Sequence, residues 1–168
     1  MTQHAVRTRT LSATDFAVPP EDRYFEDYTE GAVYEYGHVS VSEDEIVRYA
    51  EQFDPQPIHI DREFAATGPF GGLIASGWHS CGLMMRLLAD HYLSRVASLA
   101  SPGGDELRWA VPVRPGDQLR LRTTTLETRA SRTKPDRGIL RTRIELVNQD
   151  DLVPVSLVAM NMMRKRSV

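Results

Sequence analysis

The segment SGWHSCGLMMRLLADHYLSRVAS, residues 76–98, decides the fold class. When it is drawn as a helix, apolar residues fall on nearly every side and polar residues are few, which is typical of a helix surrounded by other elements. Ser76 precedes the apolar run and can cap the first turn through its side chain. The segment therefore predicts one long buried helix.

The sequence after this helix alternates in the manner of β-strands. Strands are predicted over residues 107–113, 118–129, 139–148 and 153–164, a loop over 100–105, and turns at 115–117 and 148–151. One further strand is predicted before the helix, over residues 32–41. This pattern predicts an α+β domain in which an antiparallel sheet wraps around the long helix.

Two shorter helices are predicted between the first strand and the long helix. Ser42 and Glu45 form a capping box, and the helix that they start ends at Asp54 because Pro55 follows. Asp61 can cap a second helix over residues 62–66, which Gly68 ends. We expect residues 1–23 to form an N-terminal arm, lying on the domain or extended from it, and residues 24–168 to form a single domain.

Composition excludes several classes of protein. The chain has 168 residues, the size of one domain, and its formal net charge of -3 leaves no basic footprint for nucleic acid. Cys81 is the sole cysteine, so neither an intrachain disulfide nor a zinc site is expected. Residues 1–20 lack the apolar run of a signal peptide, and no apolar stretch reaches the length of a membrane helix. These features predict a cytoplasmic protein that does not enter membranes.

The stretch FDPQPIHID, residues 53–61, carries the strongest candidates for chemistry. Its two prolines restrict the backbone, so Asp54 and His59 are expected on an ordered loop. A carboxylate and an imidazole a few ångströms apart can hold one water between them and pass protons near neutral pH. Alternatively, Asp54 caps a backbone amide and His59 is a structural histidine, and spacing alone leaves both interpretations open.

Gly77 is the second candidate, because the first amides of a helix have no intrahelical acceptor and lie at the positive end of its dipole. The Gly77 amide could therefore bind a substrate carbonyl oxygen as an oxyanion hole does. The alternative is structural: Ser76 caps the helix and Gly77 allows close packing.

These segments together resemble the MaoC-like dehydratase and R-specific enoyl-CoA hydratase family of the hotdog fold. The resemblance rests on Asp54-x-x-Pro57-x-His59, on Phe64-Ala65-Ala66, on the glycine that opens the long apolar helix, and on VPVRPGDQL at residues 111–119. It spans residues 24–163. Three positions depart from the family pattern: Gln56 stands where Asn is common, Ser76 where His is common, and Met85 near a position often held by Ser.

The resemblance implies a hydro-lyase that adds water to an enoyl thioester or removes it from a 3-hydroxyacyl thioester. Asp54 and His59 would hold the water and share the proton transfers, and the Gly77 amide would bind the thioester oxygen. Ser76 and Gln56 are expected beside them in substrate binding. No metal or redox cofactor is implied, because the substrate carries its own coenzyme A or acyl carrier protein thioester.

The resemblance also implies a homodimer, or a larger homo-oligomer, with the acyl pocket near the interface. The sequence leaves two alternatives to the hydro-lyase function: a hotdog acyl-CoA thioesterase, and a non-catalytic partner subunit of a heterodimeric dehydratase.

Other reactive residues have simpler interpretations. Cys81 is predicted to be a core thiol and not a nucleophile, and His79 and His91 to be core or surface histidines. The basic residues 164–166 could meet coenzyme A phosphates, but a solvated tail is the simpler expectation.

Overall fold

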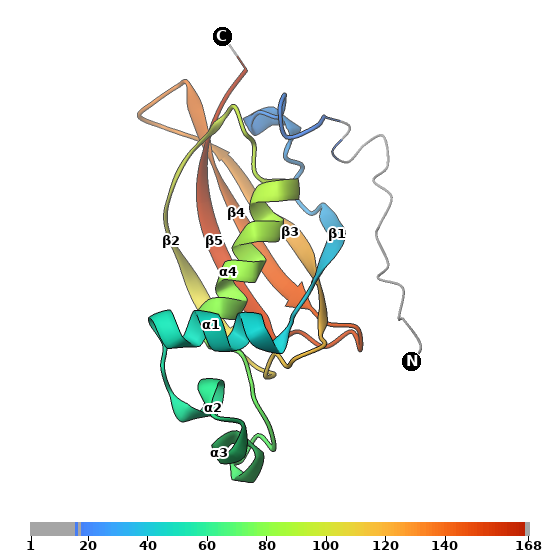
Figure 1. The fold of residues 1–168 in the computed structure, drawn as a ribbon. Coiled ribbons are helices and arrows are strands. Elements are labelled where there is room, and N and C mark those ends of the chain that lie inside the picture. The colour runs from blue at the N-terminus through green and yellow to red at the C-terminus, as the bar shows by residue number, and fades with distance from the viewer. Residues whose placement is uncertain (1–15, 17, 167–168) are drawn as a thin grey trace.

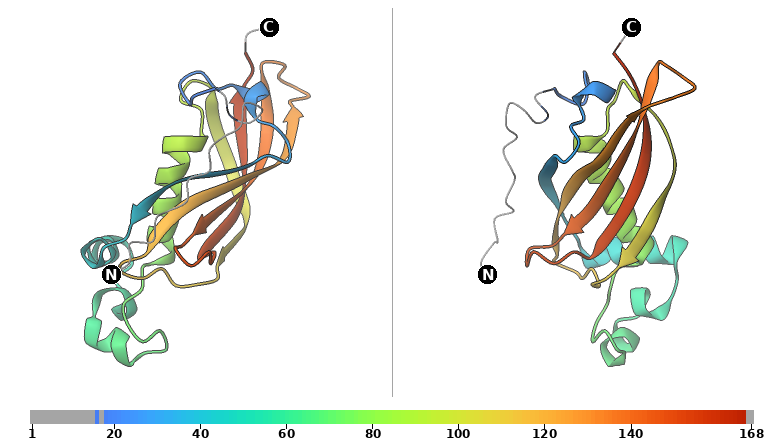
Figure 2. Two further views of the ribbon diagram at one scale, coloured as in Figure 1. Left: turned by 90° about the vertical axis from the view of Figure 1, so that its right-hand side faces the viewer. Right: turned by 180° about the vertical axis from the view of Figure 1, so that it is seen from behind.

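The computed structural model describes Phe16 and residues 18–166. They form an α+β domain in which one antiparallel sheet packs against one central helix (Figure 1). The strands are β1 (Val33–Ser40), β2 (Ser98–Trp109), β3 (Gln118–Ala130), β4 (Arg137–Val147) and β5 (Val155–Arg164), in the spatial order β1-β3-β4-β5-β2. Figure 2 shows the sheet twisting around the helix from two further sides. The predicted fold class, with most strands after the helix, is confirmed.

The central helix ends earlier than predicted. Helix α4 (Gly77–Leu87) continues into a π-helical turn, η2 (Leu88–Tyr92), and ends at Tyr92 and not at residue 98. Nη1 of Arg23 donates hydrogen bonds to the carbonyls of His91 and Tyr92, at 2.9 and 2.7 Å. The Ser94 hydroxyl then accepts a hydrogen bond from the Ala97 amide at 2.8 Å, which turns the chain toward β2. The helix end is therefore set partly by a residue distant in sequence.

The buried end of the helix is attached to the middle of the sheet by Tyr92. Thr125 of β3 lies opposite Thr142 of β4 in the sheet register. The fully buried Tyr92 hydroxyl contacts both threonine hydroxyls, at 3.2 and 2.9 Å. These contacts satisfy polar groups that would otherwise be costly to bury.

One side of α4 is not covered. Trp78 and Met85 on this helix are 59% and 49% exposed. The prediction of a helix buried within other elements is therefore wrong for this side of the helix in the single chain.

The loop predicted at residues 100–105 is wrong, because strand β2 includes these residues. These residues belong to the strand and pair with β5, with Gly103 opposite Met160 and Gly104 opposite Ala159. Shifts of register absorb the irregular segment, and Gly103 has a φ of 146°. Because β2 is an edge strand, it tolerates such bulges. It ends at Trp109, so the strand predicted at 107–113 stops early.

The helices between β1 and α4 begin where their capping residues predicted. Helix α1 (Glu43–Phe53) has the capping box of Ser42 and Glu45. Helix α3 (Arg62–Thr67) is capped by Asp61, whose side chain accepts a hydrogen bond from the Phe64 amide at 3.0 Å. A short helix between them, α2 (Pro57–Ile60), was not predicted. All three lie at the end of the sheet where α4 begins (Figure 1).

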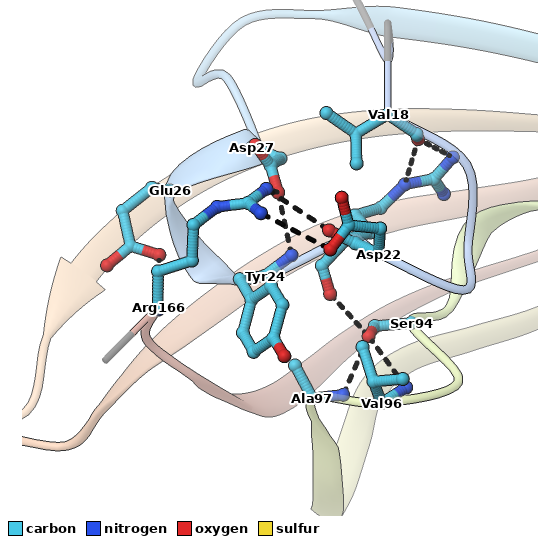
Figure 3. A network of polar contacts seen from close by, with 10 residues as sticks. Val18, Asp22, Tyr24, Glu26, Asp27, Ser94, Val96, Ala97 and Arg166 are labelled. Carbon is cyan, nitrogen blue, oxygen red and sulfur yellow. Dashed lines mark hydrogen bonds and ion pairs between the residues drawn. The ribbon is translucent and has the colours of Figure 1, made fainter.

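The N-terminal segment is tied to the C-terminal end of β5. Figure 3 shows Arg166 between acidic residues that flank and form the short helix η1 (Phe25–Asp27). Its guanidinium donates to Asp27 at 2.5 Å, and its amide donates to Glu26 at 3.0 Å. Residues 18–23 lie on the domain, whereas residues 1–15 and 17 of the expected arm are outside the described residues. The domain boundary at residue 24 stays a prediction.

Candidate active site

Asp54 and His59 are positioned by the end of α1 and the turn of α2. The Asp54 amide donates to the Ala50 carbonyl at 2.8 Å and closes α1, after which Pro55 cannot continue the helix. Pro57 occupies the first turn of α2, where its missing N–H removes no hydrogen bond. The His59 amide donates to the Gln56 carbonyl at 2.9 Å. The loop is therefore ordered, as its prolines predicted.

The imidazole of His59 faces the carboxylate of Asp54. Nε2 of His59 lies 3.4 Å from Oδ2 of Asp54. Nδ1 of His59 lies 2.8 Å from the carbonyl of Ile74. Because a carbonyl oxygen only accepts hydrogen bonds, Nδ1 carries a proton and Nε2 is left to exchange one with Asp54 or a ligand. His59 is 4% exposed, so the ring is held inside the protein.

Both carboxylate oxygens of Asp54 accept hydrogen bonds from neighbouring side chains. The Ser76 hydroxyl donates to Oδ2 at 2.7 Å, and the Gln56 amide donates to Oδ1 at 2.6 Å. These two hydrogen bonds, that from Ser76 first, lower the pKa of Asp54 below its ordinary value. Asp54 is therefore held as a carboxylate next to the imidazole.

Gly77 is the first residue of α4, as predicted. Ser76 caps the helix by accepting a hydrogen bond from the Trp78 amide at 3.2 Å. The Gly77 amide, one residue earlier, has no acceptor within its own helix. The Ser76 side chain is fully buried and bonded to Asp54 as well, so one hydroxyl joins the helix start to the carboxylate.

A pocket of about 370 Å³ brings these groups together. Four of the five predicted site residues line it, namely Asp54, His59, Gln56 and Gly77. Ser76 does not line the pocket, but its hydroxyl donates a hydrogen bond to Asp54, which does. The rest of the lining is mainly apolar and comes from Phe70, Ile74, Ala75, Trp78, Ser80, Trp109, Ala110, Val111, Pro112, Val113 and Val155. The arrangement offers a proton-exchanging pair and a free helix amide in a largely apolar cavity.

Several lining residues were missed by sequence reasoning. Trp78 and Trp109 are the two tryptophans of the chain, and both line the pocket. Ser80 lies one turn after Ser76, and its hydroxyl donates to the Ser76 carbonyl at 3.2 Å. The four-residue spacing of Ser76 and Ser80 places both on one helix face and could have indicated Ser80. Trp109 belongs to strand β2, which is distant in sequence, so no local signal could have indicated it.

The weaker candidates lie elsewhere or are structural. Burial raises the pKa of the Cys81 thiol, which disfavours the reactive thiolate. His79 is buried, stacks on Tyr49 at 4.7 Å between ring centroids, and has its pKa lowered by burial. Arg166 is held by acidic residues of the N-terminal segment. None of the three residues Cys81, His79 and Arg166 lines the pocket.

Within residues 16 and 18–166, no three His, Cys, Asp or Glu side chains gather as a metal site would require. No helix in the same part of the chain combines the length and apolar character needed to cross a membrane.

The chain is similar to several known proteins. A family model described as MaoC like domain matches residues 26–148. The uncharacterized protein YdeM of Bacillus subtilis is 30% identical over 127 residues, which cover 76% of this chain and 89% of YdeM. The 3-hydroxyacyl-thioester dehydratase Z of Mycobacterium tuberculosis is 36% identical over 84 residues, which cover 49% of this chain and 56% of that protein.

A solved structure extends the similarity to the whole domain. The MaoC-like dehydratase from Rhodospirillum rubrum superposes with a TM-score of 0.81 at 35% identity, covering 87% of this chain and 99% of that one. Together with the family model over residues 26–148, this match shows that the chain belongs to the MaoC-like dehydratase family and has its hotdog fold.

Proposed function

We propose that this protein is an acyl-thioester hydro-lyase that interconverts a 2-enoyl thioester and a 3-hydroxyacyl thioester. The observation that carries the proposal is that Asp54, His59 and Gly77 line one pocket. The family contains hydratases and dehydratases, and the name of dehydratase Z states a 3-hydroxyacyl thioester as its substrate. The proposed substrate is the thioester of coenzyme A or of acyl carrier protein.

In the hydration direction, a water molecule in the pocket would contact both Asp54 and His59, whose facing atoms are 3.4 Å apart. As one of the pair removes a proton from the water, its oxygen bonds to the β-carbon and the carbon–carbon double bond is lost. The electron pair moves onto the thioester oxygen, where the Gly77 amide stabilises the developing charge. A proton then returns to the α-carbon, so the product contains all the atoms of water.

The electrostatics of the site support this reaction. A carboxylate whose two oxygens both accept hydrogen bonds is a weak base, and it can bind a water molecule and stabilise an imidazolium. His59, with Nε2 left to exchange a proton, is suited to carry it between water and substrate. The apolar lining strengthens the interaction of the amide with charge on the thioester oxygen.

We also propose that the working form is a homodimer or a larger homo-oligomer. Strand β2 is an open edge of the sheet, and a second copy would protect it. The exposed Trp78 and Met85 on α4 provide apolar surface for such a contact.

The test is an assay with crotonyl-CoA and longer enoyl-CoA substrates. Loss of the enoyl absorbance without release of free thiol supports hydration, whereas thiol release identifies a thioesterase instead. Asp54→Asn and His59→Ala are each expected to lower kcat by about 100-fold or more. Full activity in either variant would refute the mechanism, and an inert wild type would favour the non-catalytic partner subunit.

A further inference from the structure

Trp109, at the end of β2, covers the first residue of α4. Its indole N–H donates a hydrogen bond to the Gly77 carbonyl at 3.0 Å. A Cβ atom at position 77 would lie 2.6 Å from Cε2 and 2.7 Å from Nε1 of the indole, closer than real contacts allow. A side chain at position 77 would therefore displace the tryptophan ring, and glycine allows the indole to pack directly against the start of the helix.

The two peptide groups on either side of Gly77 are held at three of their four polar atoms. In the peptide after Gly77, the carbonyl accepts from Trp109 and the Trp78 amide donates to Ser76. In the peptide before it, the Ser76 carbonyl accepts from the amide and the hydroxyl of Ser80, at 3.0 and 3.2 Å. The remaining polar atom is the amide nitrogen of Gly77, which belongs to a pocket-lining residue.

The ring of Trp109 is itself supported. Trp78 packs against it edge to face, with centroids 5.4 Å apart and an interplanar angle of 77°. An aromatic pair in this geometry adds to the stability of the contact. The indole is thus held over the start of the helix from two directions, by the Gly77 carbonyl and by the Trp78 ring.

We propose that Trp109 is a positioning residue for the Gly77 amide. By holding the Gly77 carbonyl and filling the space beside its Cα, Trp109 fixes the direction of the amide N–H and keeps water from that side of the peptide. The role rests on the proposed function, in which this amide binds the thioester oxygen. A donor that is already oriented loses no energy to reorganisation when charge develops on the oxygen.

The test compares Trp109→Phe and Trp109→Ala with Phe64→Leu, a control at an exposed aromatic residue of α3 outside the pocket. Trp109→Phe keeps an aromatic ring but lacks the N–H donor, so kcat for enoyl-CoA hydration should fall about fivefold while KM stays within about twofold. Trp109→Ala should lower kcat further, and Phe64→Leu should leave both constants unchanged. An unchanged kcat in Trp109→Phe would overturn the proposal.

A second measurement reports the mobility of the Gly77 amide and does not depend on catalytic activity. Nuclear magnetic resonance relaxation should show a lower order parameter for the Gly77 N–H in Trp109→Phe than in the wild type, with no change in Phe64→Leu. The same order parameter in all three proteins would overturn the positioning role. If the wild type hydrates no thioester but the order parameter falls, the proposed function fails and the structural role of Trp109 stands.

Discussion

The hydroxyl of Ser76 donates a 2.7 Å hydrogen bond to Oδ2 of Asp54 while accepting one from the Trp78 amide at 3.2 Å. One buried side chain therefore serves both as the cap of the central helix and as a donor to the carboxylate. Oδ2 is also the oxygen that faces the imidazole of His59. Ser76 thus connects the start of α4 to the proposed catalytic pair.

Replacing Ser76 by Ala should shift the acid limb of the pH–activity profile to higher pH. The Ser76 hydrogen bond is the largest cause of the lowered pKa of Asp54, so its loss raises that pKa toward the ordinary value. Activity that needs the carboxylate is then lost at a higher pH as the solution is acidified. The measurement is kcat/KM for enoyl-CoA hydration against pH.

Ser76→Thr and Ser40→Ala are the controls for this prediction. Ser76→Thr retains a hydroxyl and should restore most of the wild-type profile. Ser40, whose hydroxyl contacts Gln118 on the exposed face of the sheet, should be dispensable for it. An acid limb at the same pH in Ser76→Ala and the wild type would show that the hydrogen bond does not control Asp54.

Asp54 should also make stability depend on pH. Its pKa is lower in the folded protein than in the unfolded chain, so the ionised group stabilises the fold above the unfolded pKa, about 3.9. This contribution is lost as the pH falls through the folded pKa. The difference in free energy of unfolding between wild type and Asp54→Asn should therefore shrink from about pH 6 to about pH 3 in urea titrations. A constant difference would contradict the prediction.

The elements that were predicted well have signals in neighbouring residues. Helix α1 starts at the capping box of Ser42 and Glu45 and ends before Pro55, and the structure shows both. The elements that were predicted poorly depend on distant residues. The end of the central helix needs Arg23, and the strand character of residues 100–105 needs pairing with Met160 and its neighbours in β5.

The same distinction holds for the site. Asp54, Gln56 and His59 lie within six residues, between the end of α1 and α2, so their proximity could be predicted from spacing. Gly77 could be placed with them by the family resemblance. Trp109 could not, because its contact with Gly77 depends on how the end of β2 meets the start of α4. Which residues close a pocket is decided by such tertiary contacts.

Tyr92→Phe should destabilise the protein by about 1–3 kcal/mol, because Thr125 and Thr142 lose their shared buried partner. Urea unfolding at neutral pH measures the change. Tyr49→Phe is the matched control: Tyr49 contacts Phe53 and His79 through its ring, which the substitution keeps, and a change within about 0.5 kcal/mol is expected. A loss below about 0.5 kcal/mol in Tyr92→Phe would show that the contacts of the Tyr92 hydroxyl with the two threonines do not stabilise the fold.

Arg23→Met should lower the free energy of unfolding more than substitution of a nearby exposed arginine does. The Arg23 side chain is buried and donates to carbonyls at the end of the central helix and to Val18. Its guanidinium also lies 3.7 Å from the centre of the Phe16 ring. Losing a charged donor at a helix C-terminus, where the dipole favours a cation, should cost about 2–5 kcal/mol of unfolding free energy.

Arg95→Met provides the comparison for Arg23→Met. Arg95 lies three residues after the end of the central helix, is largely exposed, and forms an ion pair with Glu21 at 2.6 Å. Surface pairs of this kind contribute about 0–1 kcal/mol, so Arg95→Met should leave the urea midpoint nearly unchanged. If Arg23→Met lost no more free energy of unfolding than Arg95→Met, the hydrogen bonds of Arg23 to the helix end would contribute no more than a surface ion pair does.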